Sequence, residues 1–70
     1  MANQVELFGR NLRAVREEKG WTQEELAEKS GLASVQISRV ERGVREVRLT
    51  TLLRLTAALE TTPARLFEGL

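Results

Sequence analysis

The stretch TQEELAEKSGLASVQISRV, residues 22–40, predicts two short helices joined by a tight turn. Thr22 followed three positions later by Glu25 is the reciprocal capping-box arrangement that begins a helix. Gly31 can adopt a positive φ without steric cost, so we expect the first helix to end there. The second helix is expected over about residues 34–43. The rest of the chain must then pack around this pair.

Three further helices are expected around the pair. Residues 4–18 carry apolar side chains at spacings of three and four and are followed by a glycine that suits a left-handed C-cap. A fourth helix is expected over about 49–59, and Thr62 followed by proline predicts a short fifth over about 63–68. No stretch alternates with period two, so we predict an all-α bundle in a single domain over residues 1–70. The residues expected to face inward are Val5, Phe8, Leu12, Val15, Leu26, Ala27, Ile37, Val40, Leu49, Leu52, Leu55, Thr56 and Leu59.

Composition excludes most classes of catalytic chemistry. The 70 residues contain no cysteine, histidine or aspartate, which excludes disulfides, thiolate metal sites and the usual catalytic triads. We therefore expect no enzyme activity, no metal and no cofactor. No apolar run approaches the roughly 20 residues that span a bilayer, so the chain is expected to be cytoplasmic and to have no membrane partner.

Charge is segregated along the chain, although the net charge is only +1. Residues 17–28 carry five glutamates against one lysine, whereas residues 39–54 carry five arginines against two glutamates. A local basic face of this kind is expected of a nucleic-acid contact, and an ordinary solvated helix face is the alternative. Within the second segment, four arginines recur at a spacing of three, namely Arg39, Arg42, Arg45 and Arg48.

Three segments together resemble a known family. They are FGRNLRAVREEKGWTQEELAEKSGL at residues 8–32, ISRVERG at 37–43 and LTTLLRLTAALETTPARLF at 49–67. The chain is similar to the Xre-type helix-turn-helix family, which includes relatives of phage repressors and Cro and of restriction-modification controller proteins. The resemblance implies a compact, five-helix, lambda-repressor-like domain with its helix-turn-helix at about residues 22–42. Its third helix would enter the major groove of double-stranded DNA, usually as a dimer on an inverted repeat.

The resemblance also implies roles for individual residues. Arg39 is expected to bond guanine O6 and N7 together, and Val35 to meet a thymine methyl. Gln23 matches a phosphate-binding glutamine whose amide also braces Ser34. Because Ala33 has no side-chain acceptor to cap the third helix, Ser34 is an alternative cap, which would compete with base reading. The implied base-reading residues are Ser34, Val35, Gln36, Ser38 and Arg39, and the implied phosphate contacts are Thr22, Gln23, Arg42, Gly43, Arg45 and Arg48.

Two charged pairs have implied roles away from the DNA. Arg16 and Glu41 match an ion pair that in this family joins the first helix to the end of the third, and that would orient the recognition helix. Glu24 and Glu28 match positions where acidic residues of some phage repressors touch RNA polymerase. Solvated glutamates near a helix N-terminus are the alternative for this second pair.

Apolar residues near the end of the chain suggest an oligomer. Leu53, Phe67 and Leu70 are expected to form a symmetric homodimer patch, with a folded-back core contact as the alternative. The resemblance implies a transcriptional regulator that binds an inverted-repeat operator. It would act as a repressor, and also as an activator if it contacts RNA polymerase. The competing interpretation is a protein-interaction module such as the antitoxin of a toxin pair. No small-molecule ligand is expected, because 70 residues leave no room for an effector-binding domain.

Overall fold

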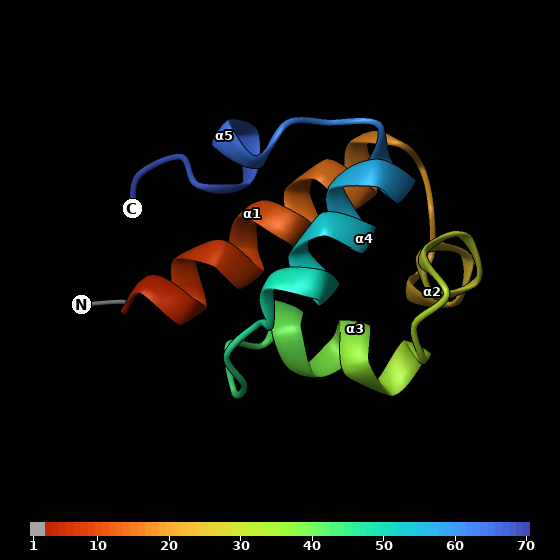
Figure 1. Cartoon of the computed structure of the whole chain (residues 1–70), viewed down its shortest axis with the longest axis horizontal. Coiled ribbons are helices and arrows are strands. Elements are labelled where there is room, and N and C mark those ends of the chain that lie inside the picture. The colour runs from red at the N-terminus through yellow and green to blue at the C-terminus, as the bar shows by residue number, and fades with distance from the viewer. Residues whose placement is uncertain (1–2) are drawn as a thin grey trace.

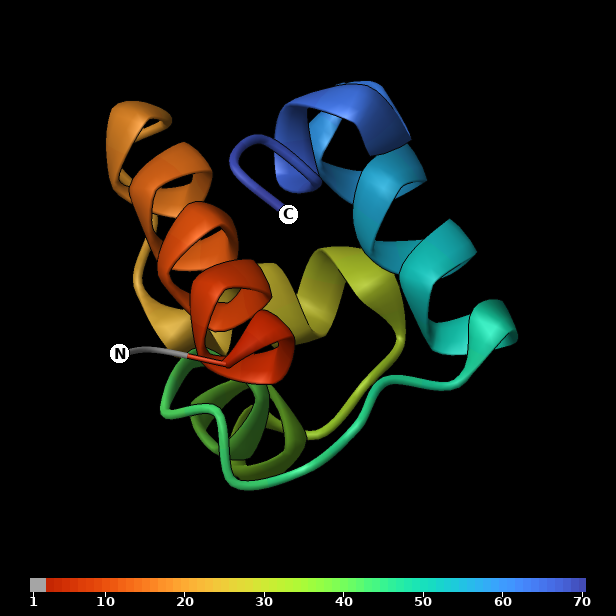
Figure 2. The same cartoon turned by 90° about the vertical axis from the view of Figure 1, so that its left-hand side faces the viewer.

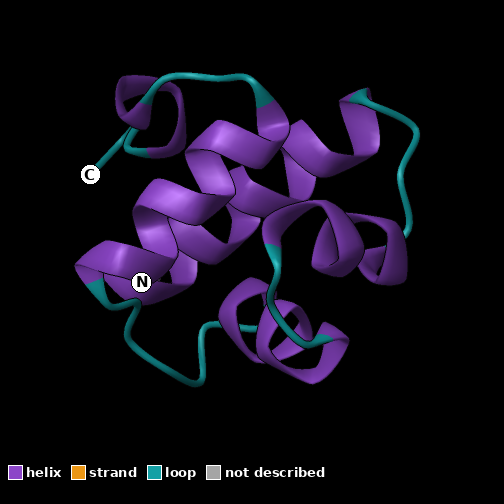
Figure 3. Ribbon diagram, turned by 45° about the vertical axis from the view of Figure 1, so that its right-hand side comes forward, coloured by secondary structure: helices purple, strands orange, loops and turns teal. Residues whose placement is uncertain are grey.

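The structure is a computed structural model that describes residues 3–70. It contains five α-helices, and residues 3–70 contain no strand (Figures 1 and 3). The predicted all-α, five-helix architecture is confirmed. The helices are α1 (Gln4–Glu18), α2 (Gln23–Ser30), α3 (Ser34–Glu41), α4 (Leu49–Leu59) and α5 (Pro63–Leu66).

Two helices end earlier than the sequence pattern suggests. Helix α3 ends at Glu41, because Arg42 is its C-cap and Gly43 then turns the chain with a φ of 70°. Helix α5 ends at Leu66, where the backbone N–H of Phe67 already bonds to carbonyls of the same short helix. Both ends are set by the backbone geometry of the following residue.

The caps of the helix-turn-helix are only partly those expected. Thr22 and Glu25 form the predicted reciprocal capping box, with distances of 3.0 and 3.1 Å. The N-cap of α3 is Ala33, so the suggestion that Ser34 caps this helix is wrong. The alanine side chain accepts no hydrogen bond, and the cap consists instead of Gln36 Oε1 accepting from the Ala33 N–H at 2.9 Å. Helix α3 thus begins with half of a capping box.

One apolar core joins all five helices. Each helix contributes at least one large, fully buried side chain to it. The prediction that Leu49 faces inward is wrong, because this side chain is 69% exposed. Leu49 lies one turn before Leu53, which is 53% exposed, so both lie on the face of α4 turned away from the core. The buried core residues are Phe8, Leu12, Val15, Leu26, Ala27, Ile37, Val40, Leu55, Leu59 and Leu66.

Helix α1 holds the end of α3 through a backbone contact that sequence reasoning missed. A Cβ at Gly9 would overlap the carbonyl oxygen of Val40 and lie 2.8 Å from that of Glu41. A Cβ at Gly43 would lie 2.8 Å from the Cα of Glu6. The close approach therefore fixes the C-terminal turn of α3 against α1. Figure 2 shows α3 and the segment that connects it to α4 at one edge of the molecule.

Candidate nucleic-acid interface

The outer face of α3 has no role in the core. Ile37 is fully buried and Val40 is 6% exposed, so these two side chains pin the inner face of the helix. On the other side Val35 is 50% exposed, and Arg39 is exposed as well. Ser34 and Ser38 are half-buried, and Gln36 is exposed. The structure thus leaves the side chains predicted to read bases accessible along one short helix.

The four arginines spaced at three residues are exposed and have no carboxylate partner. Within residues 3–70, none of Arg39, Arg42, Arg45 and Arg48 forms a salt bridge, whereas Arg13, Arg16 and Arg65 each do. Arg42 Nε donates a long hydrogen bond, 3.4 Å, to the carbonyl oxygen of Ser38 in its own helix. Unpaired guanidinium groups are available to an external anion.

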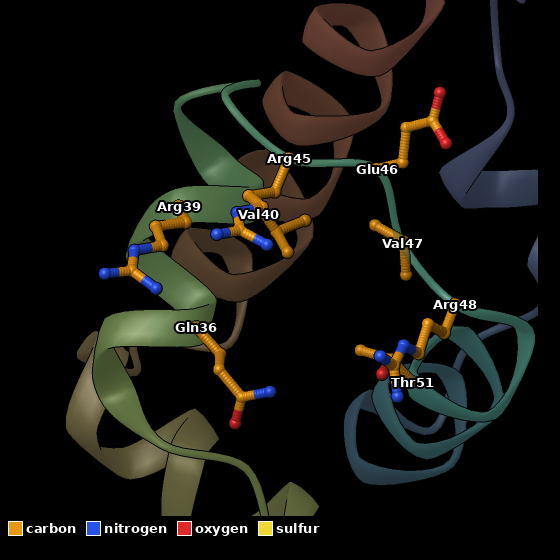
Figure 4. Close-up of a pocket in the computed structure, with 8 residues that line it drawn as sticks. All are labelled: Gln36, Arg39, Val40, Arg45, Glu46, Val47, Arg48 and Thr51. Atoms are coloured by element: carbon orange, nitrogen blue, oxygen red, sulfur yellow. The ribbon is translucent and has the colours of Figure 1, made fainter.

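A hollow of about 280 Å³ brings the two predicted classes of contact together (Figure 4). Gln36 and Arg39, predicted to read bases, share it with Arg45 and Arg48, predicted to hold phosphates. It opens beside the start of α4, whose N-cap Arg48 provides no side-chain cap. The remaining lining residues are Val40, Glu46, Val47 and Thr51, while Ser34, Val35, Ser38, Arg42 and Gly43 lie outside the lining.

The ion pair between Arg16 and Glu41 is present and largely buried. Arg16 Nε and Nη2 donate to the two carboxylate oxygens at 2.5 and 3.0 Å, and the side chains are 10% and 4% exposed. The hydrogen bonds with Glu41 raise the pKa of Arg16 above its ordinary value, so the guanidinium stays charged at neutral pH. Arg16 Nη1 also donates to the carbonyl oxygen of Trp21 at 2.6 Å. The pair therefore ties α1, the start of the helix-turn-helix and the end of α3 together.

Gln23 lies differently from the arrangement that the resemblance implied. Its Nε2 donates to Glu41 Oε1 at 3.1 Å, so the amide braces the buried ion pair and not Ser34. The hydroxyl oxygen of Thr22 accepts from the Glu25 N–H, which leaves the hydroxyl hydrogen able to donate outward. Gln23 is half-buried and Thr22 is exposed, so both remain at the surface.

The apolar residues predicted to form one dimer patch divide into two places. Phe67 and Leu70, each 43% exposed, line a second hollow of about 300 Å³ together with Val5 and Phe8. The Phe67 ring centroid lies 6.0 Å from that of Phe8, so it is partly a core contact. Leu53 is outside that lining, on the exposed face of α4.

Sequence reasoning also missed a clamp on the C-terminal segment. Asn11 Nδ2 donates to the carbonyl oxygens of Leu66 and Glu68 at 2.9 and 2.8 Å. Arg65 supports the same junction through a 2.8 Å bond to Glu18. A polar asparagine beside the apolar face of the first helix indicates a hydrogen-bonding role, but the sequence spacing does not predict its partners.

Other kinds of site find no support in the part of the chain that is described. Residues 3–70 hold no group of three or more acidic, histidine or cysteine side chains placed to bind a metal ion. None of their helices is long and apolar enough to cross a membrane. The accessible face of α3 and the adjacent basic hollow are therefore the main candidate site.

Comparison with known proteins identifies the family. A helix-turn-helix family model matches residues 12–66. The chain belongs to the Xre-type helix-turn-helix family. Control protein C.SmaI of Serratia marcescens is 43% identical over 61 residues, which are 87% of this chain and 73% of C.SmaI. Antitoxin HipB of Escherichia coli (strain K12) is 39% identical over 49 residues, 70% of this chain and 56% of HipB.

Solved structures of this helix-turn-helix family share the fold closely. The restriction-modification controller protein C.AhdI from Aeromonas hydrophila has a TM-score of 0.87 at 44% identity, covering 90% of this chain and 96% of C.AhdI. The controller protein C.Esp1396I, solved as a tetramer on its natural 35 base-pair operator, has a TM-score of 0.86 at 32% identity, covering 97% and 90% of the two chains. The family is one of DNA-binding regulators and not of enzymes.

Proposed function

We propose that this protein is a sequence-specific DNA-binding transcriptional regulator that places α3 in the major groove of an inverted-repeat operator. The observation that carries the proposal is the row of exposed, unpaired arginines beside the accessible face of α3. It is supported by the similarity to C.Esp1396I, which was solved on operator DNA. Because a regulator of this family acts where the DNA is, we place it in the cytoplasm.

The side chains divide by the part of the DNA they would contact. Arg39 is the main base reader, because a guanidinium bonds both acceptors of a guanine edge. Ser34, Val35 and Ser38 complete the base-reading set on α3. Phosphate contacts fix register and affinity without reading sequence. They are assigned to Thr22, Gln23, Arg42, Gly43, Arg45 and Arg48.

A random duplex pool tests the function directly. Selection at about 0.15 M salt, where nonspecific phosphate binding is weakened, should enrich an inverted repeat whose half-sites lie about 34–36 Å apart. The 31 Å longest extent of the monomer suits one half-site per copy. Failure to enrich any motif would defeat the proposal and favour the alternative, an antitoxin-like module that grips a partner protein.

Replacing Arg42 with alanine should weaken binding to every duplex by the same factor. Arg42 is the C-cap of α3 and lies outside the lining of the hollow, and its exposed guanidinium would neutralise a phosphate. The slope of log affinity against log salt should therefore fall by about one per subunit. Fluorescence anisotropy across a salt series measures it. Arg13→Ala removes the same charge from α1, where the partner is Glu17, and should leave the slope unchanged. A change in base preference would contradict the assignment.

We propose that two copies of the chain pair through Leu53, so replacing Leu53 with glutamate should convert this dimer into a monomer. Leu53 is 53% exposed on the outer face of α4, so a glutamate there stays solvated in the monomer. In an interface between two copies, the same carboxylate would be buried without a partner, which would destabilise the dimer. Analytical ultracentrifugation measures the association, and thermal unfolding of the dilute protein verifies that the monomer fold survives. An unchanged dimer would place the interface elsewhere, for example at Phe67 and Leu70.

Replacing both Glu24 and Glu28 with alanine tests the proposed polymerase contact. Both glutamates are exposed on α2, and neither forms a salt bridge within residues 3–70. We expect activated transcription in a purified system to be lost while operator affinity is unchanged. Equal loss of activation and affinity would tie the glutamates to operator binding, and loss of neither would leave them as solvated side chains. Either result would contradict the polymerase contact.

A further inference from the structure

The side-chain amide of Gln36 is held in one orientation by the start of its own helix. The backbone N–H of Ala33 is a donor, so the Gln36 atom 2.9 Å away must be the amide oxygen. Ala33 has no side-chain acceptor to cap α3, so the hydrogen bond that Gln36 accepts caps the start of the helix instead. Turning the amide over would leave the Ala33 N–H facing a second donor. The cap therefore dictates where the amide nitrogen points.

The nitrogen points into the hollow between α3 and the start of α4. Figure 4 shows it directed toward Arg48 and Thr51, with the oxygen turned back toward the α2–α3 turn. Arg39 and Arg45 line the same hollow, although the Arg39 guanidinium extends away from Arg48 and Thr51 in Figure 4. The polar side chains of Gln36, Arg45 and Arg48 are all hydrogen-bond donors. Glu46 also contributes to the lining, but its carboxylate extends away from the hollow in Figure 4. A site of this composition suits an anion with several acceptor oxygens.

We propose that this hollow receives one phosphate of the DNA backbone and that Gln36 donates to it, so that Gln36 is not a base reader. The proposal rests on the proposed function and revises the role that the family resemblance implied for this residue. In the usual pairing of glutamine with adenine, the amide oxygen and nitrogen face one base edge together. Here the oxygen is engaged with the protein backbone, and presenting it to DNA would break the cap on α3.

The experiment separates the donor from the cap. Gln36→Ala removes both, so it is made in an Ala33→Ser background, where the new hydroxyl accepts from the N–H of residue 36 and restores a cap. In the same background, Gln36→Glu keeps an acceptor for the N–H of residue 33 but puts a carboxylate into the hollow. Each protein, with Ala33→Ser alone as the matched control, is titrated against the selected operator, its single base-pair variants and an unrelated duplex. Thermal unfolding confirms that every variant is folded.

We expect Gln36→Ala in this background to bind every duplex about tenfold more weakly per subunit, since a hydrogen bond to a charged group is lost. The ranking of operator variants and the salt slope should stay unchanged, because glutamine carries no charge. Gln36→Glu should lose more than Gln36→Ala on every duplex. A changed preference at one base pair, or no change on any duplex, would overturn the phosphate assignment. If the control protein itself showed no operator preference, the proposed function would fail instead.

Single neutral phosphates locate the contact. In a series of operators that each carry one methylphosphonate, the control protein should lose affinity at the phosphate seated in the hollow. The Gln36→Ala variant should lose less than the control at that same position and as much as the control elsewhere. Equal losses at all positions for both proteins would also overturn the assignment.

Discussion

Replacing Glu41 with alanine should lower the free energy of unfolding by about 3–5 kcal/mol, the usual effect of removing one partner of a buried ion pair. Arg16 would keep its charge with a side chain only 10% exposed, and Gln23 would lose the acceptor of its amide. A small domain is stable by only about 5–15 kcal/mol, so much of that margin would disappear. Urea denaturation followed by circular dichroism measures the loss.

Two control variants separate the buried charge from other effects of the substitution. Glu41→Gln keeps the side-chain volume and an oxygen that accepts from Arg16, so its loss should be smaller than that of alanine. Glu17→Ala breaks the exposed pair with Arg13, whose side chains are 63% and 55% exposed, and should change stability by less than about 1 kcal/mol. Equal effects of Glu41→Ala and Glu17→Ala would show that burial of the pair contributes nothing.

The same ion pair shows how far sequence reasoning extends. Capping residues and glycines act within a few positions, so Thr22, Glu25 and Gly31 were sufficient to place α2 and its end. Arg16 and Glu41 are 25 residues apart, and only the family resemblance related them. No local rule connects such distant positions. Long-range pairs are therefore predicted by homology, while helix ends are predicted by backbone chemistry.

Contacts that depend on tertiary packing were the ones missed. Leu49 fits the apolar spacing of α4, but the first turn of that helix extends past the core and leaves the side chain 69% exposed. Gly9 gave no signal, because a glycine inside an amphipathic helix shows its purpose only when a second backbone lies against it. The bond from the Ala33 N–H to Gln36 Oε1 was also missed, because only the missing side-chain acceptor at Ala33 was considered and not its backbone donor. The spacing of residues predicts which face of a helix they share, but the contacts of each side chain depend on how the helices pack.

Replacing Arg39 with alanine should weaken operator binding by about 1–3 kcal/mol per half-site and relax the preference at one base pair. Arg39 is exposed on the outer side of α3, with no carboxylate partner within residues 3–70, so its guanidinium is available to a guanine edge. On a symmetric operator both half-sites lose the contact, which makes the total effect the largest expected for a single surface substitution. Competition titrations against all base pairs at each half-site position measure it.

Two comparisons decide whether Arg39 reads a base. Arg39→Lys keeps the charge but not the paired donors of the guanidinium, so most of the base preference should be lost while binding to unrelated duplexes is retained. Arg42→Ala, as the phosphate reference, should weaken all sequences alike. If Arg39→Ala behaved like Arg42→Ala, with a uniform loss and a lower salt slope, Arg39 would be a phosphate contact. Sequence recognition would then rest on Ser34, Val35 and Ser38, whose short side chains offer one hydrogen bond or one methyl contact each.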